Sequence, residues 1–472
     1  MPSKIHNTAA ISLGLAYREK LISLLKGDLN FHDQPSNYAS HNFHAFPAKF
    51  PPQLPRKFIE GLTEPGDIVL DPMMGSGTTV VEALLSGRKP IGFDIDPLAV
   101  RLSKVKTSKV DIEQIKGAGQ RIIHQASLAL NNREMLLGEL ATRFDNKTRE
   151  FIDYWFAPPT QLELVALVIQ IEKLTDLELR NFFSVILSSI IITKSGGVSL
   201  AFDLAHTRPH RAKVVLSQSG EIILGEDTAR SDSRRVRLLT KTLHSPIEEF
   251  EKRLQRNLSG LIRYTPDMIS PRIQFADAQQ LPLDNETVDL IVTSPPYISN
   301  AIDYMRAHKF SLVWLGYPIQ ELGNKRKAYI GGEAVSDTTL LDLPSVVHQV
   351  VHSVGQLDRK KAQAVHRYYS EMTLVLKEMY RVLRPGKAAI VVVGTSVIRE
   401  IDTQIDLCLA EIGKHIGFEI PAIGVRNLDR NRRMLPAGAT IDGNSQIEQR
   451  MHEEFIIGFY KPISGQGNND HK

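Results

Sequence analysis

A glycine-rich loop flanked by acidic residues is the first feature of the sequence that could do chemistry. Asp71 ends a short apolar run, and Gly75 and Gly77 follow it closely. Glycines at these positions let the backbone approach a ligand and open the next helix. Asp94 lies roughly 20 residues further on, where an acid can bind the hydroxyls of a ribose. No lysine follows Gly77, which excludes a P-loop; a tight turn without a ligand is the alternative, and the two acids favour a nucleoside.

A proline-containing tetrapeptide is the second such feature. Ser294, Pro295, Pro296 and Tyr297 directly follow the apolar residues 290–292. Two prolines fix φ and remove two backbone donors, which leaves the nearby carbonyls free to accept hydrogen bonds. With the Ser294 hydroxyl and the Tyr297 ring, they could bind an exocyclic amino group by its two hydrogens while the ring stacks on a base. A rigid turn that caps a strand is the alternative for this segment by itself.

The elements around these two features predict an α/β fold. Residues 67–71 and 90–96 read as buried strands with a helix over 78–87 between them, which is a βαβ unit. The alternation resumes after residue 270 and predicts five further strands: 273–276, 288–293, 388–393, 418–425 and 454–460. The last two strands lack a crossover helix, so we expect an antiparallel hairpin at the sheet edge. The predicted fold class is a Rossmann-like, seven-stranded α/β sheet.

Residues 108–268 interrupt this alternation and read as a largely helical insertion with a basic, polar end. Five regions are therefore expected. They are an N-terminal helical extension (1–40), a first, cofactor-binding half of the α/β domain (41–107), the helical insertion (108–268), a second, catalytic half (269–463) and a tail (464–472).

These motifs resemble those of the amino-specific DNA methyltransferases, which methylate the amino nitrogen of cytosine or adenine. Residues 71–79 resemble the cofactor motif of that family, and residues 44–51 resemble the segment before its first strand. Residues 294–297 resemble its catalytic motif, in the serine form usually found in cytosine-N4 enzymes. The resemblance covers about 41–106 and 270–397, with a weaker similarity at 452–455. It implies a Rossmann-like methyltransferase sheet and S-adenosyl-L-methionine as the cofactor.

The resemblance also implies roles for individual residues. The catalytic residues would be Ser294, Pro295, Pro296 and Tyr297, with Ser294 and the Pro295 carbonyl holding the target amino group. The nitrogen would attack the sulfonium methyl directly, on a base flipped out of the duplex. The cofactor-binding residues would be Phe46, Lys49, Asp71, Pro72, Met73, Gly75, Ser76, Gly77, Thr78, Thr79, Asp94, Ile95, Asp277 and Ala278. By itself, Asp277 is a weak signal, because aspartate commonly ends strands.

Double-stranded DNA is the expected partner, and a separate cognate restriction endonuclease is a candidate second one. Basic loops suit phosphate contacts, and the residues we expect there are Arg234 and Arg235 in the insertion and Arg426, Arg430 and Arg432 after the sixth strand; a solvated surface is the alternative for each loop. Asp303, Arg306 and His308 follow the catalytic motif and are expected to face the cleft. For His308, a structural role is favoured over that of a general base.

Composition limits which partners, cellular locations and chemistries remain. Over 472 residues the net charge is +4, which identifies no polyanionic partner by itself. The apolar run at 182–192 is too short to span a bilayer, and no secretory signal is recognisable, so we expect a cytoplasmic protein without a membrane partner. Cys408 is the one cysteine; it is expected in a helix interior, which excludes a multi-cysteine metal site and carbon-5 methylation through a catalytic thiol. No metal is expected.

The leading reading is a site-specific DNA methyltransferase of a restriction-modification system, with cytosine N4 as the preferred target. Adenine-N6 methylation is the nearest alternative, since the serine form of the motif is a tendency. An RNA amino-methyltransferase would usually bring a recognisable RNA-binding domain, and none is apparent. A catalytically silent nucleic-acid-binding module is the alternative from a different class, and the intact motifs argue against it.

Overall fold

The computed structural model describes most of the chain. The described residues are 2–47, 49–193, 197–202, 204, 209–225, 240–266, 268–298, 303–331, 339–428 and 453–463.

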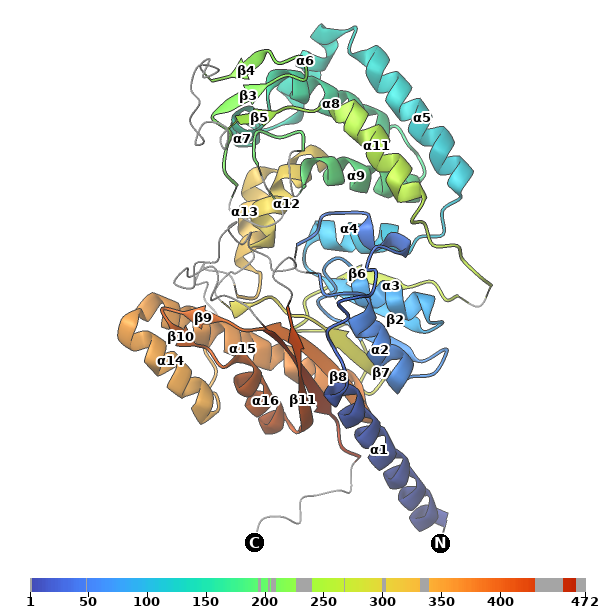
Figure 1. The fold of residues 1–472 in the computed structure, drawn as a ribbon, viewed down its shortest axis with the longest axis vertical. Coiled ribbons are helices and arrows are strands. Elements are labelled where there is room, and N and C mark those ends of the chain that lie inside the picture. Colours follow the sequence, from blue (N-terminus) through green and yellow to red (C-terminus); the bar gives the residue numbers. More distant parts are fainter. Residues whose placement is uncertain are drawn as a thin grey trace.

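A seven-stranded sheet forms the centre of the fold (Figure 1). Its spatial order is β11-β12-β8-β7-β1-β2-β6. The strands are β1 (Ile68–Asp71), β2 (Lys89–Asp94), β6 (Arg272–Phe275), β7 (Val288–Thr293), β8 (Leu383–Gly394), β11 (Glu419–Asn427) and β12 (Glu453–Tyr460). The strands from β6 to β8 pair in parallel, whereas β12 pairs antiparallel with both β8 and β11. This confirms the predicted α/β class and the antiparallel pair at the end of the chain. Strand β8 is longer than the predicted strand 388–393, because it already begins at Leu383.

Helices cover both faces of the sheet, because successive residues of each buried strand point to opposite sides. Val69 and Leu290 face a core shared with α1 (Pro2–Lys26) and α2 (Gln53–Leu62). Leu70 and Ile291 face the opposite core. The helices of that second core are α14 (Ser345–Leu357), α15 (Arg359–Val382) and α16 (Ile405–Ile416). Two further helices, α3 (Thr78–Leu85) and α4 (Pro97–Lys106), follow β1 and β2.

The helical insertion lies above the carboxyl ends of the central strands (Figure 1). Its elements are α5 (Ile112–Ala129), α6 (Arg133–Arg143), α7 (Asn146–Trp155), α8 (Pro158–Glu172), α9 (Leu177–Ile191), β3 (Val214–Leu216), β4 (Ile222–Leu224), β5 (Thr240–Thr242) and α11 (Pro246–Leu258). Several helices begin where the sequence supplies a capping oxygen. Asp111, Asp145, Asp176 and Ser245 each accept from a backbone N–H in the first turn. Strands β3 and β4 form an antiparallel hairpin, and β5 pairs with β3 in parallel.

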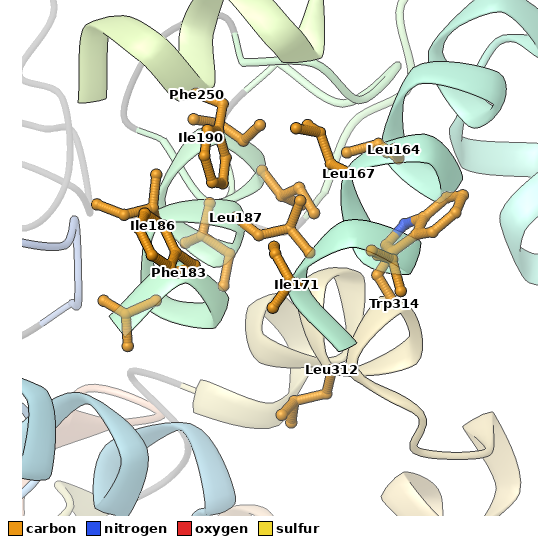
Figure 2. Close-up of a cluster of buried hydrophobic side chains, with 14 of the residues drawn as sticks. Leu164, Leu167, Ile171, Phe183, Ile186, Leu187, Ile190, Phe250, Leu312 and Trp314 are labelled. Carbon is orange, nitrogen blue, oxygen red and sulfur yellow. The ribbon is translucent and has the colours of Figure 1, made fainter. Parts of the chain in front are cut away.

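One hydrophobic core unites the insertion with the segment that follows the catalytic tetrapeptide (Figure 2). Phe183 of α9 and Phe250 of α11 are fully buried in this core. Leu312 and Trp314 join it from α12 (Tyr304–Leu312) and η3 (Val313–Leu315). These two side chains therefore fix α12 between the insertion and the sheet. The next helix, α13 (Ile319–Lys327), continues from η3.

Three smaller observations complete the fold. The remaining short elements are η1 (Ala39–Asn42), β9 (Val397–Ile398) and β10 (Ile401–Asp402). Cys408 is fully buried in α16, as predicted, and burial raises the pKa of its thiol to about 11. In the described part of the chain, none of the helices combines the length and apolar character needed to cross a bilayer.

Candidate active site

The glycine loop joins β1 to α3 in a conformation that few other residues could adopt. Gly75 has a φ of 47° and Gly77 a φ of 75°, both in the left-handed region. Gly77 is the residue that caps α3, and its N–H donates to the Met74 carbonyl at 2.7 Å. A Cβ atom at Gly77 would lie 2.5 Å from Ser103 Oγ on α4. The loop therefore lies tightly against α4, with its backbone exposed toward the cavity at the end of β1.

Asp71 connects this loop to β7, the strand that precedes the Ser294–Tyr297 tetrapeptide. The carboxylate is buried; its Oδ1 accepts from Thr293 Oγ1 at 2.7 Å and from the Met73 N–H at 3.2 Å. Burial raises the pKa of Asp71 to about 6, although these hydrogen bonds oppose the shift. Thr293 ends β7 and immediately precedes Ser294. One hydrogen bond thus holds the start of the catalytic tetrapeptide against the loop predicted to bind the cofactor.

Asp94 is held at the end of β2 by two backbone N–H groups. Its Oδ2 accepts from Gly75 at 2.8 Å, and its Oδ1 accepts from Asp96 at 2.8 Å. Burial, followed by the nearby Asp96 charge, raises the pKa of Asp94 to about 7. The half-buried carboxylate keeps lone pairs available toward the cavity, which suits hydrogen bonds from ribose hydroxyls.

Asp96 and His308 form a buried pair behind this carboxylate that the sequence did not reveal. Asp96 caps α4 by accepting from the N–H groups of Leu98 and Ala99, at 2.7 and 3.2 Å. Its other oxygen lies 2.5 Å from His308 Nδ1 and accepts from the Tyr329 hydroxyl at 2.9 Å. Burial opposes ionisation of Asp96, yet the interactions with His308 and Tyr329 hold its pKa below the usual value. The Asp-Pro sequence at the helix start signals the cap, whereas both partners come from distant segments.

The catalytic tetrapeptide faces the same cavity. Ser294 and Pro296 line it, Pro295 is buried, and the half-buried Tyr297 points its hydroxyl to Glu454 Oε1 at 3.3 Å. Burial and the Glu454 carboxylate raise the pKa of Tyr297 well above its usual value, which keeps the phenol neutral.

Arg426, which the sequence placed in a basic loop after the sixth strand, is not a loop residue. It lies buried in β11, directly opposite Glu454 of β12, and its guanidinium pairs with the Glu454 carboxylate.

The cavity gathers most of the residues predicted to bind the cofactor. Gly77 and Thr79 support the loop from behind and are not among the lining residues. The predicted residues that do line it are Phe46, Lys49, Asp71, Pro72, Met73, Gly75, Ser76, Thr78, Asp94, Ile95, Asp277 and Ala278. The lining residues that were not predicted to bind the cofactor are Phe50, Met74, Asp96, Ala276, Ser294, Pro296, Tyr304, Tyr329 and Ile330.

The chemistry of this cavity fits a nucleoside that also carries an amino-acid group. Asp94 offers acceptors for the ribose, and Asp277 lies at the end of the next strand, where it can accept from an amino group. Phe46, Ile95 and Ile330 supply apolar walls for a flat base. The loop backbone at Gly75 leaves room for close approach, since its missing Cβ would meet only the Phe46 ring at 3.4 Å. Together these residues suit S-adenosyl-L-methionine, which supplies an electrophilic methyl group when bound.

The residues expected to contact DNA lie in different environments. Asp303 caps α12, and its largely buried carboxylate pairs with Arg306 at 3.3 Å and with Arg326. His308 is fully buried, with its ring centroid 4.8 Å from that of Phe46. It therefore has a structural position behind the cavity wall. The four arginines Arg234, Arg235, Arg430 and Arg432 lie outside the described residues.

Comparisons with known proteins agree with this geometry. Residues 28–105 match the N6_N4_Mtase family model, described as DNA methylase. The type II methyltransferase M.MvaI of Kocuria varians is 24% identical over 413 residues, which are 82% of this chain and 83% of the relative. M.BsoBI of Geobacillus stearothermophilus is 24% identical over 434 residues, 81% and 79% of the two chains. M.BglI of Bacillus subtilis is 44% identical over 73 residues, 16% and 21% of the two chains.

The fold is a Rossmann-like α/β sheet that carries an acid-lined cavity. The matched family model and the type II relatives support an amino-specific DNA methyltransferase family, the N4/N6 family, for a chain with this fold. The same assignment supports S-adenosyl-L-methionine as the methyl donor.

Proposed function

We propose that the chain is a site-specific DNA methyltransferase that methylates the exocyclic amino group of a flipped base, with cytosine N4 as the preferred target. The observation that carries the proposal is the shared cavity of Ser294 and Pro296 with Asp71, Asp94 and Asp277. The Thr293–Asp71 hydrogen bond fixes the two halves of this cavity relative to each other. Methyl donor and methyl acceptor would therefore meet in one preorganised site.

The residues of the tetrapeptide act by positioning the acceptor. The Ser294 hydroxyl and the Pro295 carbonyl would each accept one hydrogen of the target amino group, which turns the nitrogen lone pair toward the donor. The Tyr297 ring, held by Glu454, would stack on the base. A base within a duplex cannot reach this cavity, so flipping would be required at a cost of roughly a few kcal/mol.

The choice of cytosine N4 rests on the serine form of the motif, and adenine N6 is the second candidate. The context we propose is restriction-modification, since the similar relatives carry the name type II methyltransferase. A separate cognate endonuclease would then be a partner of the same pathway.

The test is direct identification of the product. Purified protein is incubated with unmethylated plasmid and labelled S-adenosyl-L-methionine, and the digested DNA is analysed by mass spectrometry. We expect N4-methylcytosine, with a loss of about 100-fold in rate for Ser294→Ala because the acceptor is misplaced. Affinity for S-adenosylhomocysteine should be unchanged in that variant.

The matched control is Ser127→Ala, since Ser127 is exposed on α5 and its hydroxyl donates only to the Ile123 carbonyl of its own helix. Its rate should equal that of the wild type. N6-methyladenine as the product would overturn the choice of base. Absence of any methylated nucleoside from a protein that binds S-adenosylhomocysteine would refute DNA methylation.

A further inference from the structure

A large groove adjoins the donor cavity. Its volume is about 1110 Å³, and it shares Phe46, Lys49, Phe50 and Thr78 with the cavity, so the two spaces are direct neighbours. Residues 34–47 form one side of the groove, and Tyr297 of the catalytic tetrapeptide lies along it. The last turns of α11 form another side. A ligand in the groove would therefore lie beside Tyr297 and next to the cavity of Ser294 and Pro296.

Helix α11 is fixed firmly at this groove. Phe250, which Figure 2 shows, and Leu254 are both buried in the core that includes the insertion. At the end of α11, the buried Asn257 donates its side-chain N–H to the Phe43 carbonyl at 3.3 Å. The chain after the helix is equally close, since a Cβ at Gly260 would lie 2.5 Å from the Ala39 carbonyl. These contacts fix the position of the side of α11 that faces the groove.

That side of α11 carries two arginines, Arg253 and Arg256, and both line the groove. They are three residues apart, which places them next to each other on the helix surface. Neither guanidinium has a hydrogen-bond or ion-pair partner in the described part of the chain. Arg256 is in the last turn, where the helix dipole favours a cation, but this does not explain the half-buried Arg253. Burial, and next the charge of Arg256, lowers the pKa of Arg253.

The two acids that line the groove each have another partner in the described part of the chain. Glu249 accepts from Lys252 at 2.9 Å and acts on Arg253 less than burial and the Arg256 charge do, whereas Glu454 pairs with Arg426. Two adjacent cations repel each other, so an anion bound between them would be stabilised. A guanidinium binds phosphate oxygens through two parallel N–H groups, and it does so without reading sequence.

We propose that Arg253 and Arg256 are a phosphate clamp for the DNA strand whose base enters the active site. This assignment rests on the proposed function, because it takes the groove to be the path of the methylated strand. The clamp would hold the backbone beside the flipped nucleotide and contribute affinity that is independent of sequence.

Salt dependence of DNA binding tests the clamp. Binding of a labelled duplex is followed by fluorescence anisotropy between 50 and 200 mM salt, with saturating S-adenosylhomocysteine. Loss of each phosphate contact reduces the slope of log K against log salt by about 0.9, so Arg253→Gln with Arg256→Gln should reduce it by about 1.8. The change should be the same for unrelated duplexes. Double replacement by lysine keeps both charges and should keep the slope.

The matched control is Lys116→Gln, which removes an exposed cation from α5, outside the groove. Its slope should equal that of the wild type. If the double glutamine variant keeps the wild-type slope and the wild type methylates DNA, the clamp is refuted and the proposed function is not. Weakened binding of an RNA duplex, with DNA binding intact, would assign the arginines to a different nucleic acid and also overturn the clamp. A wild type that neither binds nor methylates DNA would refute the proposed function itself.

Discussion

Replacing Gly77 by alanine should damage the protein more than the same change at Gly75, although both glycines have positive φ. An alanine in the left-handed region costs roughly 1 to 2 kcal/mol, and this term applies to both positions. At Gly75 the added Cβ would meet only the Phe46 ring, at 3.4 and 3.9 Å. At Gly77 it would lie 2.5 Å from Ser103 Oγ, 3.0 Å from Ser103 Cβ and 3.3 Å from Ser103 Cα. The last contact is with the backbone of α4, which a side-chain rotation cannot relieve.

Overpacking of this kind typically costs about 1 to 3 kcal/mol. The free energy of unfolding of Gly77→Ala should therefore fall by roughly 2 to 5 kcal/mol, against about 1 to 2 kcal/mol for Gly75→Ala. Urea unfolding of the two variants measures the difference. Ser103→Ala in the Gly77→Ala background removes the 2.5 Å contact and should restore about 1 kcal/mol. Equal unfolding free energies for the two glycine variants, or no coupling to Ser103, would refute the steric reasoning.

Two further predictions concern the acids at the end of β2. The pKa of Asp94 is raised from 3.8 to about 7, so the folded protein binds this proton more tightly than the unfolded chain does. The protonated carboxyl therefore contributes to the free energy of unfolding. This contribution is complete below the unfolded pKa and is lost as the pH rises through about 7. The melting temperature of Asp94→Asn should fall less steeply as the pH rises through about 7. If the melting temperature of the variant depends on pH as steeply as that of the wild type, the raised pKa of Asp94 is refuted. His308→Ala leaves the buried Asp96 carboxylate without its closest side-chain partner and should cost about 3 kcal/mol or more in urea unfolding. His415→Ala, at an exposed site, should stay within about 0.5 kcal/mol, and a similarly small effect at His308 would contradict the proposed pairing.

The sequence predicts the site residues that lie at the carboxyl ends of the parallel strands. Parallel strands meet at one edge of the sheet, so Asp71, Asp94, Asp277 and Ser294 could be expected in one place once their strands were recognised. The turn glycines and the alternation of strand and helix are local signals. They are sufficient to predict the strands and three of the acids that line the cavity, Asp71, Asp94 and Asp277.

The rest of the cavity depends on contacts that local patterns do not contain. Tyr304, Tyr329 and His308 approach Asp96 and the donor cavity only because α12 packs into the core of the insertion. Arg426 resembled an exposed loop residue because its partner, Glu454, is on a strand that returns antiparallel beside it. The partners in each of these pairs are far apart in the sequence, and neither member indicates the other.

The position of the helical insertion affects how the chain reaches its native state. It separates β2 from β6, although these strands are paired in register from Ile91–Arg272 to Asp94–Phe275. The entropy of closing a disordered loop rises slowly with its length, by about 0.6 kcal/mol per doubling, and long-range parallel pairing is slow to form. Most residues of the core around the insertion come from the insertion itself, and the Tyr264 hydroxyl donates to the Thr107 carbonyl near its two ends. Prior folding of the insertion would therefore bring the two strands together, and we expect β6 to join the sheet only after that step.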